Sequence, residues 1–188
     1  MSDKIARRDF LGTVALVGAA AAAGQNFIAT PAKAAGENPI ITSSASELAA
    51  AIRSKKLSSK AVVEAHLEQI AKVNPKLNAI VQLTADTARK EADEADAALA
   101  RGDIKGPLHG VPMTIKDTLE TTGVICTGGT KGRANFVPKA DATAVARLRA
   151  AGAIFLGKTN VPELAGALES DNLVYGRTNA SVTHRCII

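Results

Sequence analysis

The chain has 188 residues, of which 46% are hydrophobic, so it is long and apolar enough to bury the core of one domain. Aromatic residues make up only 3% and tryptophan is absent, which predicts an aliphatic, alanine-rich core. The formal net charge is +5, but no basic patch with interleaved aromatic residues is present, which argues against a nucleic-acid-binding protein.

Residues 1–34 have the features of a targeting segment. The adjacent arginines Arg7 and Arg8 come first, and an apolar run follows from Phe10 to Ala23. This run is shorter than the ~20 apolar residues that a membrane-spanning helix needs. The small residues at Ala32-Lys33-Ala34 fit a cleavage site, so the segment is expected to be removed.

This pattern resembles a twin-arginine export signal. The resemblance implies a protein that folds before export, with the twin-arginine translocase as a partner and a periplasmic or secreted location. No stable membrane span is expected after cleavage. The alternatives are an uncleaved N-terminal anchor and an ordinary secretory signal with a chance arginine pair.

Two helices are predicted next. The spacing of Ser44 and Glu47 is that of a capping box, and it predicts a helix from there to about residue 54. A second helix is expected from about residue 60 to residue 73, and Asn74-Pro75 is expected to end it.

The sequence NAIVQL, residues 78–83, predicts a strand, and residues 84–101 predict a long charged helix that Gly102 closes. The carboxylates of this helix lack an apolar setting that would separate their pKa values, so they do not form an acid–base pair.

A buried strand is predicted for Val111–Ile115, and it ends on Lys116 and Asp117. Lysine is rarely buried without a partner. Burial lowers the pKa of its amine, and a neutral lysine can act as a general base, whereas the neighbouring Asp117 acts in the opposite direction. The alternative is a solvated lysine paired with Asp117 at the surface.

A glycine- and threonine-rich turn that includes Thr127 and Thr130 follows this strand. A helix is then predicted for Asp141–Ala151, with Asp141 as its N-cap. The next buried strand is Ala153–Leu156. The strand–helix–strand order predicts parallel pairing of the two strands with a right-handed crossover.

Residues 152–159, GAIFLGKT, satisfy the P-loop pattern. The middle of the pattern is an apolar strand that follows a helix, so its amides are expected to bond within a sheet. Nucleotide binding is therefore rejected.

Four side chains are candidate nucleophiles: Cys126, Ser170, Ser181 and Cys186. None has a base at a recognisable spacing, although a pair of Cys126 with His109 or His184 stays open. A disulfide between the two cysteines is a further open alternative. No metal-ligand spacing is present.

Several segments together resemble the amidase signature family, in the family's order: GPLHGVPMTIKD, TGGTKGR, DATAVARLRAAGAIFLGKTNVPELA and YGRTN. They lie between about Ser44 and Asn179. The resemblance implies an α/β fold with a mixed, mostly parallel sheet flanked by helices, of which this chain is the incomplete N-terminal part. It also implies hydrolysis of a small-molecule amide by a Ser–cis-Ser–Lys triad.

The resemblance assigns the catalytic lysine to Lys116. It places Asp117, Thr127 and Thr130 in or beside the substrate pocket, with Thr130 standing where the family more often has serine. It implies neither a metal nor an organic cofactor. The domain organisation expected is an export signal at 1–34, a partial amidase domain at 35–179 and a divergent tail at 180–188.

The family's serines lie on a glycine- and serine-rich loop beyond the YGRTN segment and further on, and no GGSSGG-like run is present in this sequence. We therefore expect an amidase fragment that is inactive or nearly so. The alternative is a non-catalytic exported binding protein or a relic. The hypothesis for residues 180–188 is a frameshift or a premature stop. Sequencing of the downstream DNA tests it, because absence of a GGSSGG-coding segment there would rule out a frameshift.

Overall fold

The computed structural model describes residues 38–179. The predicted export segment with Arg7 and Arg8 therefore lies outside the described residues, and so does the tail with Ser181, His184 and Cys186. Within residues 38–179, no helix is long and apolar enough to cross a membrane.

Three helices open this part of the chain: α2 (Pro39–Thr42), α3 (Ala45–Arg53) and α4 (Ser59–Leu77). The predicted capping box is confirmed, since the Ser44 hydroxyl accepts from the Glu47 amide and the Glu47 carboxylate accepts from the Ser44 amide at 2.7 Å. It satisfies two of the amides that a helix start leaves without partners.

Helix α4 runs past the point where Asn74-Pro75 was predicted to end it, so that prediction was wrong. A proline in the last turn removes only one helical hydrogen bond. The helix ends instead at Asn78, which adopts the left-handed conformation with φ of 52°. The Asn74 side chain accepts from the amides of Ala79 and Ile80 and so leads the chain into the first strand.

The remaining elements are β1 (Ile80–Leu83), α5 (Ala85–Ala100), β2 (Pro112–Lys116), η2 (Lys131–Arg133), α6 (Thr143–Ala150), β3 (Ile154–Thr159) and η3 (Glu163–Ala165). The strands form one mixed sheet in the order β1-β3-β2. Strands β2 and β3 are parallel and β1 is antiparallel to β3, which confirms the predicted mixed α/β arrangement.

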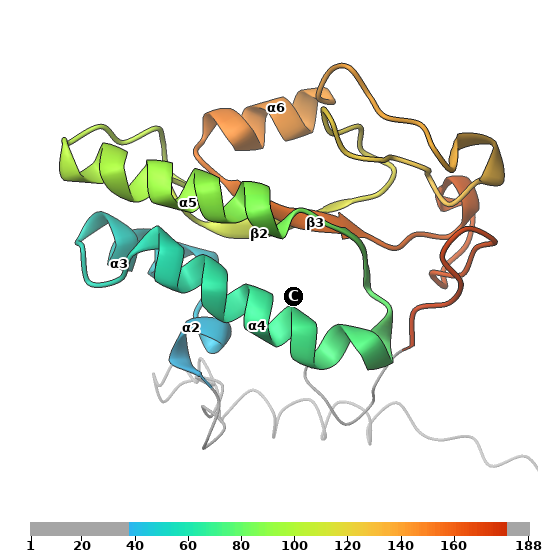
Figure 1. The fold of residues 1–188 in the computed structure, drawn as a ribbon, viewed down its shortest axis with the longest axis horizontal. Coiled ribbons are helices and arrows are strands. Elements are labelled where there is room, and N and C mark those ends of the chain that lie inside the picture. Colours follow the sequence, from blue (N-terminus) through green and yellow to red (C-terminus); the bar gives the residue numbers. More distant parts are fainter. Residues whose placement is uncertain (1–37, 180–188) are drawn as a thin grey trace, which may run out of the picture. The chain divides into compact units, whose positions relative to one another are not determined.

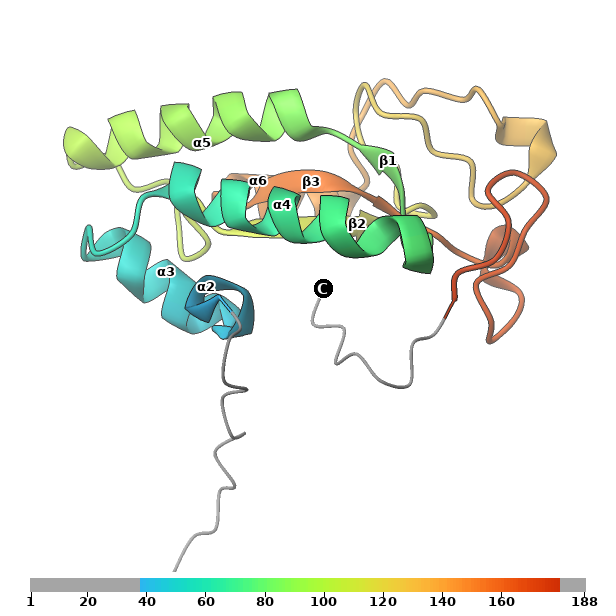
Figure 2. The same ribbon diagram turned by 60° about the horizontal axis from the view of Figure 1, so that its bottom comes forward.

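Helices cover both faces of this sheet (Figures 1 and 2). On one face, Ile154 and Leu156 of β3 pack against α4 and α5. On the other face, Phe155 packs with Ile115 and with Val145 of α6. Successive residues of β3 therefore serve two separate hydrophobic clusters, as the pleat of a strand requires.

A register shift in β3 then reverses this alternation. Met113 pairs with Phe155, but the next residue of β2, Thr114, pairs with Gly157, so Leu156 is an extra residue. The bulge moves Lys158 to the α6 face, opposite Ile115. Because β3 runs through the GAIFLGKT pattern, this segment is confirmed as a strand.

The start of α6 differs from prediction, because its N-cap is Ala142 rather than Asp141. The Asp141 carboxylate instead accepts from the Thr122 amide at 2.7 Å and from Nε of Arg149 at 3.0 Å. Burial acts to raise the pKa of Asp141, but these hydrogen bonds outweigh it and hold the pKa below its ordinary value.

Candidate functional site

Lys116 is the last residue of β2 and pairs with Thr159 of β3. Its neighbour Ile115 is buried against α6, so Lys116 faces the opposite side of the sheet, where it is exposed. Among residues 38–179, its amine forms no hydrogen bond or ion pair. The strand is only half-buried from Pro112 to Thr114, in contrast to the predicted buried strand.

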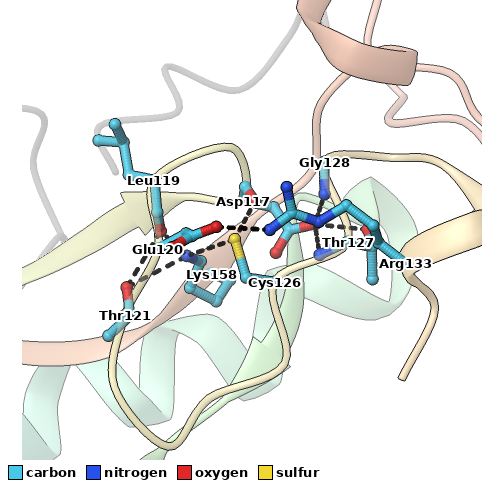
Figure 3. A network of polar contacts seen from close by, with 9 residues as sticks. All are labelled: Asp117, Leu119, Glu120, Thr121, Cys126, Thr127, Gly128, Arg133 and Lys158. Carbon is cyan, nitrogen blue, oxygen red and sulfur yellow. Dashed lines mark hydrogen bonds and ion pairs between the residues drawn. The ribbon is translucent and has the colours of Figure 1, made fainter. Parts of the chain in front are cut away.

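Asp117 is fully buried, and its side chain does not pair with Lys116. One carboxylate oxygen, Oδ2, accepts three hydrogen bonds (Figure 3). The donors are the Thr127 hydroxyl at 2.6 Å, the Thr127 amide at 3.1 Å and the Gly128 amide at 3.1 Å. The other oxygen, Oδ1, is buried and has no partner in the described part of the chain.

The Thr127–Thr130 turn is organised around this carboxylate. The Thr127 hydroxyl also accepts from the Gly129 amide at 2.9 Å, and the Thr130 amide donates to the Thr127 carbonyl at 3.2 Å. Gly128 and Gly129 have φ values of 60° and 73°, which favour glycine. The structure thus brings Asp117 and Thr127 together, and leaves the half-buried Thr130 at the end of the turn.

Sequence reasoning missed a second lysine, Lys158, which is only 1% exposed. Its amine donates to the Leu119 carbonyl and, at 3.1 Å, to the Thr121 hydroxyl, and it lies 3.8 Å from Sγ of Cys126 (Figure 3). Burial lowers the pKa of Lys158, and the nearby Cys126 and Asp117 oppose this effect. The signal that could have found it is a lysine inside an apolar strand.

The candidate nucleophile Cys126 is buried, and its thiol donates to the Asp117 carbonyl at 2.9 Å. Burial raises the pKa of this thiol, which disfavours the reactive thiolate. The alternative pair with His109 is not formed, because the ring nitrogens of His109 bond to the Ala95 carbonyl and the Lys105 amide. No cluster of metal-ligating side chains occurs within residues 38–179.

A cleft of about 530 Å³ lies on the α6 face of the sheet. Its walls include Lys158, Thr121 and Phe155. Arg149 crosses it, bonded to Asp141 and Glu91 and stacked 4.6 Å from the Phe155 ring. Lys116 and the Thr127–Thr130 turn are not part of its lining, so this cleft is separate from the site of the exposed lysine.

A mixed α/β sheet, a lysine at the end of one of its parallel strands and a glycine-rich turn beside that lysine together match the amide hydrolases that the chain resembles. The Amidase family profile matches residues 61–187. The chain therefore belongs to the amidase signature family.

Individual relatives agree with this assignment. The chain is 42% identical to an acylamidase of Rhodococcus erythropolis over 136 residues, which are 72% of this chain and 28% of the relative. It is 41% identical over 139 residues to a glutamyl-tRNA(Gln) amidotransferase polypeptide of Acidothermus cellulolyticus, covering 74% of this chain and 28% of that protein. The chain thus spans less than a third of the curated relatives it matches.

Solved structures show the same likeness. A fatty acid amide hydrolase superposes with a TM-score of 0.72 at 29% identity, over 76% of this chain and 26% of that one. The peptide amidase from Stenotrophomonas maltophilia superposes with a TM-score of 0.68 at 33% identity, over 74% and 30% of the two chains.

Proposed function

We propose that this chain supplies the lysine-bearing part of an enzyme that hydrolyses a carboxamide C–N bond to a carboxylate and ammonia or an amine. The observation that carries the proposal is the position of Lys116 at the carboxyl end of β2, beside the parallel strand β3. Ligands of parallel α/β sheets bind at this end of the strands. Membership of the amidase signature family supports the same reaction.

In the proposed mechanism, the neutral amine of Lys116 accepts a proton through a bridging serine. The nucleophilic serine attacks the amide carbonyl, the amine leaves with a proton, and water releases the acyl group. Backbone amides stabilise the oxyanion of the tetrahedral intermediate. The sequence holds no glycine- and serine-rich run, so both serines come from outside these 188 residues. Loss of the attacking group costs about 10⁶-fold in rate, so the chain by itself is inactive or nearly so.

Reconstitution tests this proposal. The 188-residue chain is co-expressed with the part of the Rhodococcus erythropolis acylamidase that it does not match, and hydrolysis of simple aliphatic and aryl amides is measured. We expect no turnover by the chain alone and turnover by the pair. In the pair, Lys116→Ala is expected to reduce kcat by at least about 10³-fold, because no other group takes its proton.

The matched control is Lys90→Ala, since Lys90 is also exposed but lies on α5. Full activity of the Lys116→Ala pair would contradict the assigned base. Turnover by the chain alone, lost in Lys116→Ala, would contradict the need for outside serines.

The alternative function is a non-catalytic exported binding protein or a relic. The observation that favours it is the separation of Lys116 from the cleft. A sharp cooperative thermal transition of the chain, with no turnover in any reconstituted pair, would support this alternative.

We also propose export by the twin-arginine translocase to the periplasm or beyond. The order of Arg7-Arg8, apolar run and small residues supports it. A fusion of residues 1–34 to a folded reporter should be exported, and the Arg7→Lys, Arg8→Lys double variant should not. Equal export of both fusions would favour an ordinary secretory signal.

A further inference from the structure

The end of β2 is held by a single carboxylate that reaches into the neighbouring turn. We propose that Asp117 is a positioning residue that joins the end of β2 to the Thr127–Gly129 turn, so that Lys116 is presented in one fixed direction. The inference rests on the proposed function, because Lys116 is the group that Asp117 positions.

The backbone of Asp117 is anchored immediately after the lysine. Its amide donates to the Thr159 carbonyl of β3 at 3.0 Å, and its carbonyl accepts from the Cys126 thiol at 2.9 Å. The Lys116 carbonyl accepts from the Leu119 amide at 2.9 Å. The main chain on the far side of Lys116 is therefore held as firmly as the strand that precedes it.

The side chain of Asp117 extends this anchor to two more segments. Through Oδ2 it accepts both amide donors and the hydroxyl donor of Thr127 and Gly128. The Gly128 carbonyl in turn accepts from the Leu164 amide at 2.7 Å, which ties the turn to the segment after β3. The packing is tight, because a Cβ on Gly129 would lie 3.1 Å from the Pro162 carbonyl oxygen.

Stability by itself does not require a carboxylate at this position. Oδ1 is buried and unpaired among residues 38–179, and leaving a buried charged oxygen without a donor is costly. The amide oxygen of an asparagine would offer the same acceptor to the three donors without burying a charge. The geometry joins this acceptor directly to the residue that follows the lysine, which is why we assign its role to the lysine site.

The first experiment needs no catalysis. Amide hydrogen exchange and ¹⁵N relaxation are measured by NMR on the 188-residue chain with Asp117→Ala, Asp117→Asn and Thr127→Val. We expect Asp117→Ala to speed exchange at Thr127 and Gly128 by at least about 10-fold through local opening, and to lower the order parameter at Lys116. Asp117→Asn should restore protection to within about 3-fold, because its oxygen accepts the same donors.

Thr127→Val removes only the hydroxyl donor and should give a smaller change in the same direction, which keeps the test informative if Asp117→Ala fails to fold. The control is Asp103→Asn, because the exposed Asp103 bonds only to the exposed Arg101. Unchanged exchange at Thr127 and Gly128 in Asp117→Ala and in Thr127→Val would overturn the inference.

The second experiment uses the reconstituted pair. Asp117→Ala is expected to lower kcat by about 100-fold with little change in KM, because small misplacement of a catalytic group costs rate rather than binding. Asp117→Asn should keep most of the rate. A loosened turn with unchanged kcat would overturn the positioning role. An inactive pair with Asp117 intact would count against the proposed function, while the exchange data would still decide whether Asp117 holds the lysine end of β2.

Discussion

Two lysines at the ends of neighbouring parallel strands have opposite surroundings. Lys116 was predicted at the mouth of a buried strand, yet its side chain is exposed, whereas Lys158 is buried. The ammonium of Lys158 has three donors and three acceptors within reach, the Leu119 carbonyl, the Thr121 hydroxyl and the Cys126 sulfur. Such a set tolerates burial, and it fastens the segment after Lys116 to β3.

The titration of Lys158 predicts a pH dependence of stability. Burial lowers the pKa of Lys158 below its ordinary value of 10.5, so between these two values the unfolded chain binds more protons than the folded chain. The free energy of unfolding therefore rises with pH across this window, relative to Lys158→Met, which lacks the group. Urea unfolding of both proteins at several pH values up to about 10.5 measures the difference.

Cys126 acts with the opposite sign, because burial raises the pKa of its thiol above the ordinary 9.0. Its stabilising contribution falls as the pH rises, but both proteins contain it, so the difference between them reports mainly on Lys158. Lys90→Met on the exposed face of α5 is the control. Parallel pH curves for the unmodified protein and Lys158→Met would contradict the prediction.

At the scale of elements, local signals were reliable where a local interaction decides the outcome. The capping box at Ser44 and the strand–helix–strand order around α6 are read from neighbouring residues, and both are confirmed. Asp141 failed as a predicted N-cap because Thr122 and Arg149 engage its carboxylate. The bulge in β3 has no local signal, since it is defined by pairing with β2.

The bulge makes a specific prediction for Gly157. A Cβ at this position would lie 2.2 Å from the Gln82 carbonyl oxygen of β1, which is backbone and cannot move aside. We expect Gly157→Ala to lower the free energy of unfolding by about 1–3 kcal/mol, as overpacking does. Urea unfolding midpoints give the measurement.

Gly132→Ala is the matched control, because a Cβ there has no atom within 4 Å. Its effect should stay within about 0.5 kcal/mol. Equal midpoints for the two variants would show that β1 and β3 are not held as closely as the structure indicates.

On the scale of the whole molecule, apolar side chains are exposed after β3. Leu164, Leu168 and Leu173 are 69%, 105% and 77% exposed. Their segment is nevertheless held to the end of β3, because the Asn172 amide donates to the Asn160 side-chain carbonyl at 2.8 Å and to the Val161 carbonyl at 2.7 Å. An ordered segment that exposes leucines favours association, which agrees with the poor solubility expected of a partly covered sheet.

Replacing these three leucines by serine is therefore expected to raise the concentration at which the protein begins to associate. Static light scattering across a concentration series measures the change, and the unfolding midpoint should stay the same, because the leucines contribute little buried area. Leu83→Ser at the end of β1, which is 54% exposed, is the control. An unchanged scattering onset in the triple variant would contradict the prediction.

The amino-acid sequence by itself determined the family, the mixed α/β class and the order of helices and strands, because these follow from motifs and periodicities within short stretches. It also placed Lys116 and Asp117 at a strand end. Tertiary structure alone decided which lysine is buried and which donors Asp117 receives. The Asp117–Thr127 bond joins residues ten apart and the Lys158–Thr121 bond joins residues 37 apart. Such contacts depend on strand register, and one bulged residue in β3 changes the face on which Lys158 lies.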